Sequence, residues 1–145
     1  EAQSSDFVIP FGQAKVEKEG TDVSIVTFSK CVGDSLEVAK ALEGEGISVE
    51  VINLLTLRPI DRDAIINTVK KTNRLVTVES GWPQCGIGSE IAAIVMESEA
   101  FDYLDAPVER ITGFDVPMPY ALPLEKAALP QDTDIKAAIY RTLGK

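Results

Sequence analysis

The side chains of this chain that could perform acid-base or nucleophilic chemistry are carboxylates, lysines and two cysteines, because its 145 residues include no histidine. Histidine is the commonest general base near neutral pH and a frequent metal ligand, so Ser-His and Cys-His catalysis are excluded. Cys31 and Cys85 lie in no metal-ligand spacing and are too few for a disulfide framework. We interpret both as incidental thiols and predict no catalytic residue and no metal site.

One glycine-rich loop, residues 80–88, could hold a nucleotide or another small molecule. Gly86 and Gly88 lie between an apolar run and a helical pattern, which resembles part of a dinucleotide-binding turn. The third glycine of that fingerprint would fall at Ile91, and Trp82-Pro83 separates the glycines from the end of the apolar run. We therefore favour a tight helix entry, with a regulatory small-molecule site as the alternative.

A second candidate is an acidic segment that contains no basic residue. Its carboxylates are Glu97, Glu99, Asp102, Asp105 and Glu109, and Phe101, Tyr103 and Leu104 lie among them. Apolar anchors ringed by carboxylates suit a basic protein partner, because long-range attraction speeds association. The alternatives are an ordinary solvated face and a carboxylate metal site, although no calcium-loop spacing occurs.

Two apolar features could form subunit contacts. Trp82 is flanked by Gly81 and Pro83 in the same loop, and tryptophan is enriched at the energetic centres of interfaces. The segment 113–120 is apolar and contains two prolines, so Val116, Met118 and Tyr120 would form an adhesive patch if exposed. The alternatives are a tryptophan folded back onto its own domain and a packed connecting segment.

The last predicted helix leads almost directly to Lys145. If Lys145 is the natural terminus, its α-carboxylate lies near the negative end of the helix dipole, where an arginine from elsewhere would relieve the repulsion. A frayed and solvated tail is the alternative.

Alternating apolar strands and amphipathic helices must position these candidates. The pattern predicts strands over 14–19, 23–28, 49–52, 75–78 and 108–112, and helices within 32–42, 61–69, 91–95 and 135–143, the second capped by Asp61. Such alternation packs as a parallel sheet with helices on both faces. We therefore predict one α/β domain, with the short first strand added antiparallel at an edge.

Length and charge limit the remaining possibilities. We assign residues 1–13 to an irregular lead-in from a missing N-terminal domain and residues 14–145 to the domain itself. The formal net charge of −9 argues against binding nucleic acid or an anionic membrane. No apolar run approaches the roughly 20 residues of a membrane span. Because the chain starts at Glu1 without a methionine, we expect a processed chain or a piece of a longer one.

A series of motifs in order resembles one family. They are Ile9-Pro10 with Gly12-Gln13-Ala14-Lys15, Val51-Ile52-Asn53-Leu54 with Leu57-Arg58-Pro59, Val76-Thr77-Val78-Glu79-Ser80-Gly81-Trp82-Pro83, Leu104-Asp105-Ala106-Pro107, and Val116-Pro117-Met118-Pro119-Tyr120. Together they resemble the C-terminal domain of pyruvate dehydrogenase beta subunits of the mitochondrial type, over essentially the whole chain. Beta subunits of branched-chain 2-oxoacid dehydrogenases typically end the last motif in Pro-His, so Tyr120 favours the pyruvate enzyme.

The resemblance implies a transketolase C-terminal fold: a three-layer αβα domain with a mostly parallel five-stranded sheet and one antiparallel edge strand. The full enzyme of this family is an α2β2 heterotetramer that decarboxylates pyruvate, acetylates lipoyl groups and so supports acetyl-CoA formation. Its thiamine diphosphate, with magnesium, lies between the alpha subunit and the N-terminal domain of beta, which also carries the catalytic histidine. The resemblance therefore implies a non-catalytic piece that binds no cofactor, located in the mitochondrial matrix or, alternatively, a bacterial cytoplasm.

The family also docks the dihydrolipoyl acetyltransferase through a small basic binding domain. The resemblance assigns this contact to Asp105 and to the terminal carboxylate, here that of Lys145. Lys145 replaces an apolar residue of the family, and its ammonium weakens the attraction for an arginine. We expect an assembly and docking domain that contacts the alpha subunit and a second beta subunit. The alternatives are a regulatory domain, the equivalent domain of a branched-chain enzyme, and an autonomous enzyme that uses Glu79 or Glu90.

Overall fold

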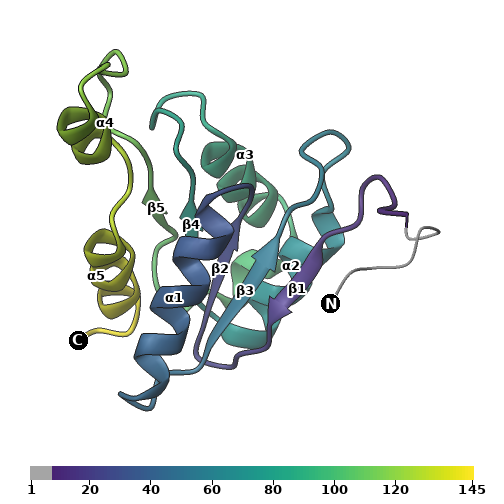
Figure 1. Ribbon diagram of the computed structural model, residues 1–145. Coiled ribbons are helices and arrows are strands. Elements are labelled where there is room, and N and C mark those ends of the chain that lie inside the picture. Colours follow the sequence, from purple (N-terminus) through teal and green to yellow (C-terminus); the bar gives the residue numbers. More distant parts are fainter. Residues whose placement is uncertain (1–7) are drawn as a thin grey trace.

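The computed structural model describes residues 8–145, which fold around one five-stranded sheet (Figure 1). The strands are β1 (Lys15–Lys18), β2 (Val23–Thr27), β3 (Val49–Asn53), β4 (Leu75–Val78) and β5 (Glu109–Ile111). Their order is β1-β3-β2-β4-β5, in which β1 runs antiparallel to β3 and the other neighbours are parallel. The predicted mostly parallel sheet with an antiparallel edge strand is confirmed.

Helices cover both faces of this sheet. They are α1 (Cys31–Glu43), α2 (Arg62–Thr72), α3 (Ile87–Met96), the 3-10 helix η1 (Glu99–Tyr103), α4 (Leu122–Ala128) and α5 (Asp132–Thr142). Side chains of α1 and α5 pack with the sheet in one core, and those of α2, α3 and η1 pack in a second core on the other face (Figure 1). Strands β2 and β4 are buried along their whole length because both faces are covered. The three-layer αβα prediction is confirmed.

Local sequence signals determine where α2 begins and ends. Asp61 accepts a hydrogen bond from the backbone N–H of Ala64 at 3.0 Å, so its predicted role as the N-cap of α2 is confirmed. The other carboxylate oxygen of Asp61 accepts from the N–H of Ala14 at 2.7 Å, which ties the start of the domain to α2. At the far end of α2, Asn73 adopts a left-handed conformation with φ 61° and ends the helix.

The sequence pattern missed α4 and η1 for the same physical reason. Neither element buries an apolar stripe: Ala128 is the buried residue of α4 and Ala100 that of η1, whereas Leu122, Leu124 and Phe101 are exposed. Without a buried face, the spacing of apolar residues carries no helical signal.

The predicted lead-in, residues 1–13, lies partly outside the described residues, since the structure describes the chain from residue 8. Residues 8–13 contain no helix or strand. Gly12 adopts φ +74° and donates its N–H to the Thr56 hydroxyl at 2.9 Å. Within residues 8–145, no helix has the length and apolar character needed to cross a membrane.

Candidate functional site

The candidate residues divide between two opposite ends of the sheet. The loops after β4 and β5 carry Trp82 and the segment 113–120, at the carboxyl ends of the parallel strands. Asp105 lies in the turn before β5, and Lys145 follows the end of α5, at the amino ends of the strands. Figure 1 shows α4 at the first end of the molecule and the C-terminus at the second. The sequence candidates therefore form two separate surfaces.

Backbone hydrogen bonds fix the position of Asp105, and its carboxylate is exposed to solvent. Its N–H donates to the Asn73 carbonyl at 2.9 Å, and the Asn73 amide donates to the Tyr103 carbonyl at 2.7 Å. The carboxylate is 57% exposed and lies 3.3 Å from a guanidinium nitrogen of Arg74. Arg74 also donates to the Thr142 carbonyl at 3.0 Å. Arg74 thus connects Asp105 with the end of α5 and brings both predicted docking positions to one end of the sheet.

Lys145 is exposed, but its backbone is tied to the last helix. Its N–H donates to the Tyr140 carbonyl at 2.9 Å, and Gly144 supplies the required left-handed turn with φ +69°. The sequence suggested that an arginine from elsewhere would complement this helix end. The structure provides Arg74, from the same chain, at the Thr142 carbonyl.

The acidic segment carries less unpaired negative charge than its sequence suggests, because lysines and arginines of other elements form ion pairs with it. The ion pairs are Arg62–Glu97 at 3.8 Å, Lys70–Glu99 at 2.8 Å, Arg74–Asp105 at 3.3 Å and Arg141–Glu109 at 2.7 Å. The hydrogen bond to Lys70 lowers the pKa of the Glu99 carboxyl. Among the described residues, Asp102 is the acid of this segment without an ion pair. A basic partner must therefore compete with internal cations at most of these carboxylates.

The opposite end of the sheet presents an apolar patch. We use this name for Trp82, Phe114, Val116, Met118, Tyr120, Leu122 and Leu124, all of which are exposed. Tyr120 is fully exposed, and the indole N–H of Trp82 donates to the Val116 carbonyl at 3.2 Å although the side chain is 55% exposed. Trp82 is therefore both anchored to its own domain and available for contact. Within the segment 113–120, Gly113 is buried and Pro119 is half-buried, whereas the other residues are exposed, so most of the segment is surface and not a packed connection.

Glu79 organises the loop 80–88 and occupies the place that a phosphate would need. Its side chain is buried and accepts hydrogen bonds from the N–H groups of Ile87 at 3.0 Å and Gly88 at 2.7 Å. A Cβ at Gly86 would lie 2.5 Å from a carboxylate oxygen of Glu79, and one at Gly88 would lie 2.9 Å from it. The glycines therefore serve the tight entry to α3. The helix N-terminus, which could otherwise bind an anion, already holds a carboxylate.

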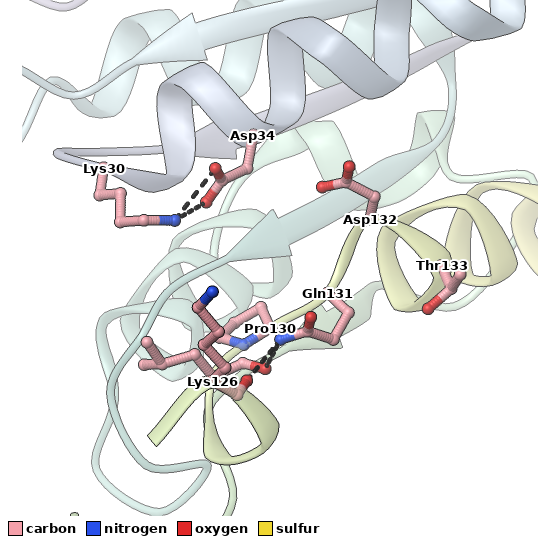
Figure 2. Close-up of a pocket in the computed structure, with 8 residues that line it drawn as sticks. Lys30, Asp34, Lys126, Pro130, Gln131, Asp132 and Thr133 are labelled. Atoms are coloured by element: carbon pink, nitrogen blue, oxygen red, sulfur yellow. Dashed lines mark hydrogen bonds and ion pairs between the residues drawn. The ribbon is translucent and has the colours of Figure 1, made fainter. Parts of the chain in front are cut away.

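A pocket of about 530 Å³ lies between the start of α1 and the segment that joins α4 to α5 (Figure 2). Lys30 pairs with Asp34 at 2.7 Å, and this hydrogen bond raises the pKa of Lys30. The Gln131 amide donates to the carbonyls of Lys126 and Leu129, both at 2.7 Å. Two lysines and two aspartates line the pocket, so it has no net charge with which to select an ionic ligand.

The cysteines and carboxylates form no metal centre within the described residues. No group of three or more potential ligands is close enough to hold an ion anywhere in residues 8–145. Cys31 is buried with its sulfur 3.3 Å from the Ser80 hydroxyl, and Cys85 is exposed.

Comparison with known proteins identifies the family of this domain. The family model described as "Transketolase, C-terminal domain" matches residues 12–135. The chain belongs to the transketolase C-terminal domain family. The match covers all five strands, Asp105 and the apolar patch, and it ends in the first turn of α5, before Lys145.

Relatives of this transketolase C-terminal domain confirm the resemblance to pyruvate dehydrogenase beta subunits. It is 59% identical over 139 residues to the mitochondrial pyruvate dehydrogenase E1 component subunit beta of Dictyostelium discoideum, covering 96% of this chain and 39% of the relative. It is 57% identical to the corresponding protein of Rattus norvegicus, covering 99% of this chain and 40% of the relative. The chain thus spans about 40% of the length of these curated relatives.

A solved structure supports the same fold. The "split gene transketolase, inactive beta4 tetramer" superposes with a TM-score of 0.84 at 32% identity, covering 99% of this chain and 46% of that chain.

In this transketolase C-terminal domain, sequence reasoning did not single out Arg74. Its contacts reach residues far along the chain, so no local motif marks it. Glu79 was considered as a catalytic carboxylate, but its acceptor oxygens are engaged by the start of α3.

Proposed function

We propose that this chain is the assembly and docking domain of a mitochondrial pyruvate dehydrogenase beta subunit and performs no cofactor chemistry of its own. The observation that carries the proposal is 57–59% identity to mitochondrial beta subunits along nearly the whole chain. In the complete enzyme, thiamine-diphosphate-dependent decarboxylation of pyruvate would use residues of the alpha subunit and the N-terminal part of beta. The same identities favour a pyruvate enzyme over a branched-chain one.

The residues of this domain do not fit thiamine diphosphate and its magnesium ion. No carboxylate cluster suited to a metal occurs within residues 8–145. The two buried glutamates are already satisfied: Glu79 binds the start of α3, and Glu50 accepts from the Thr68 hydroxyl at 2.6 Å and pairs with Lys71. The buried carboxylates of this domain are therefore not free to bind the cofactor or its metal ion.

Docking is assigned to the amino end of the sheet. Asp105 is exposed, lies at the same end as Lys145, and contacts Arg74 through one carboxylate oxygen at 3.3 Å. A basic binding domain of the dihydrolipoyl acetyltransferase would share this carboxylate with Arg74. Charge-assisted hydrogen bonds of this kind are stronger than neutral ones.

Assembly is assigned to the carboxyl end. The apolar patch, which includes Trp82, Val116, Met118 and Tyr120, exposes more aromatic and aliphatic surface than isolated apolar residues would. A contact with the alpha subunit or a second beta subunit would remove it from water. No membrane or nucleic-acid role is proposed, because the net charge is −9.

Calorimetry on the assembled enzyme, titrated with the basic binding domain at low and high salt, tests the docking assignment. Asp105→Ala should weaken binding by about 1–3 kcal/mol if its carboxylate pairs with a desolvated cation. Asp132→Ala is the matched control, since Asp132 is an exposed aspartate at the start of α5, at the other end of the sheet. Unchanged affinity in Asp105→Ala would remove Asp105 from the interface. Pyruvate decarboxylation by the 145-residue chain alone would overturn the non-catalytic assignment.

A further inference from the structure

An apolar groove lies beside Asp105, between the end of α3 and η1. Its volume is about 510 Å³, and it is lined by Ala92, Met96, Phe101, Leu104, Asp105, Ala106, Pro107 and Val108. Met96 is 58% exposed and Phe101 is 50% exposed. Asp105 is the one charged residue in this lining, so the groove joins apolar surface directly to the proposed docking carboxylate.

The local fold explains why Met96 and Phe101 are exposed to solvent. Ser98 ends the turn after α3, and its hydroxyl accepts from the Ala100 N–H at 3.4 Å to start η1. Ala100 is fully buried, which directs the neighbouring Phe101 to the surface. The two helices therefore form a wall on which Met96 and Phe101 each leave half or more of their surface exposed to solvent.

The rim of the groove is negative. Asp105 lines the groove, and two further acids, Glu97 and Asp102, are the chain neighbours of its lining residues Met96 and Phe101. The Arg62–Glu97 pair is loose at 3.8 Å, the Arg74–Asp105 pair measures 3.3 Å, and Asp102 has no ion pair within residues 8–145. The rim thus keeps negative charge that internal cations only partly compensate.

We propose that this groove receives an apolar side chain of a basic polypeptide, next to a lysine or arginine of that polypeptide that contacts Asp105. The proposal rests on the docking function proposed above and identifies the anchor of that contact. Charge complementarity selects the occupant: an anionic lipid surface and a second copy of this chain, at net charge −9, would both be repelled by the rim. Apolar anchors at the centre of an interface, surrounded by polar groups that exclude water, carry most of its binding energy.

The two kinds of contact have different salt dependence. Salt screens the attraction between Asp105 and a cation. Burial of Met96 or Phe101 against an apolar side chain does not depend on that screening. Variants of the groove and of the carboxylate can therefore be distinguished by titration at several salt concentrations.

The test uses the assembled enzyme and the basic binding domain of the acyltransferase as the probe. Met96→Ala and Phe101→Ala should each weaken binding by about five- to thirty-fold, by the same factor at low and high salt. Asp105→Asn should weaken binding mainly at low salt. Val16→Ala is the matched control, because Val16 is 46% exposed on the edge strand β1, outside both the groove and the apolar patch. Unchanged thermal unfolding would show that the groove variants fold, as expected for side chains at least half exposed.

Each result has a definite meaning. Wild-type affinity in both groove variants, with weaker binding in Asp105→Asn, would overturn the groove and leave the docking function intact. No binding of the probe to the wild-type enzyme would overturn both. A change in subunit assembly in Met96→Ala or Phe101→Ala, measured by sedimentation velocity, would make the groove a subunit contact and contradict the proposal.

Discussion

Arg74 and Asp105 form an ion pair, 3.3 Å between guanidinium nitrogen and carboxylate oxygen, that links the turn before β5 to the end of α5. The link continues because the same guanidinium donates to the Thr142 carbonyl at 3.0 Å. A cation at the C-terminal carbonyls of a helix complements its dipole. Arg74 therefore orients the proposed docking carboxylate and also closes the last helix.

Arg74→Ala should lower the free energy of unfolding by about 1–3 kcal/mol, because it removes a charged donor from partly buried carbonyls. Amide hydrogen exchange of residues 143–145 should become faster, since the end of α5 loses its cation. Urea denaturation and exchange measurements on the 145-residue chain check both effects. Lys40→Ala, an exposed cation on α1, is the control and should leave both unchanged. Equal stability of the two variants would contradict a structural role for Arg74.

Glu79→Gln should destabilise the domain by about 1–3 kcal/mol, because an amide NH2 would face one of two backbone N–H donors in a buried site. Glu90→Gln is the control: it changes an exposed glutamate of α3 and should have little effect on stability. Chemical denaturation compares the two. If both variants unfold at the same denaturant concentration, Glu79 does not hold the entry to α3.

The sequence pattern predicted the sheet well because the signals for its strands are local. Strands β2 (VSIVT) and β4 (LVTV) are rich in apolar and β-branched residues, and Asp61 precedes an apolar helical pattern. These signals can be recognised without knowledge of distant contacts. The acidic segment and the motif around Asp105 were likewise visible in the chain. The exposed carboxylate of Asp105 agrees with a docking role.

Features that depend on folding could not be predicted in this way. The cations of α2 and α5 that neutralise Glu99 and Glu109 are far from them in sequence. The partners of Glu79 are backbone N–H groups, and these cannot be recognised from the residue types in the sequence. Helix α4 buries only Ala128, so no apolar period marks it in the sequence.

Glu17 should make stability sensitive to acid. It lies at a bulge in β1, where Asn53 donates to its carboxylate at 2.9 Å and Lys15 pairs with it at 2.6 Å. The Asn53 hydrogen bond, followed by the Lys15 interaction, lowers the pKa of Glu17. A carboxyl with a lowered pKa in the folded state stabilises the fold at neutral pH, and this contribution is lost as pH falls below the ordinary range of about 4 to 5.

Glu17→Gln should therefore be less stable than wild type at pH 7 and should lose less stability on acidification. Unfolding free energies measured from neutral pH to about pH 3 check this difference. Glu37→Gln, at an exposed position on α1, should follow the wild-type curve. Parallel curves for wild type and Glu17→Gln would mean that Glu17 contributes nothing to the acid sensitivity.

Met118→Glu tests the apolar patch as a subunit contact. Met118 is 53% exposed, so the substitution should leave the domain folded. In an interface, however, the glutamate would be buried without a partner and should weaken assembly by about tenfold or more, since burying an unpaired charge is costly. Sedimentation velocity of beta subunits combined with alpha subunits should then show smaller species.

Phe101→Glu is the matched control at the other end of the sheet, because Phe101 is exposed to a similar extent, 50%. It should leave assembly intact and weaken docking of the basic binding domain, whereas Met118→Glu should act on assembly first. Normal assembly of Met118→Glu together with loss of assembly in Phe101→Glu would exchange the roles of the two surfaces. Because the two residues lie at opposite ends of the parallel strands, one pair of substitutions decides which end faces the other subunits.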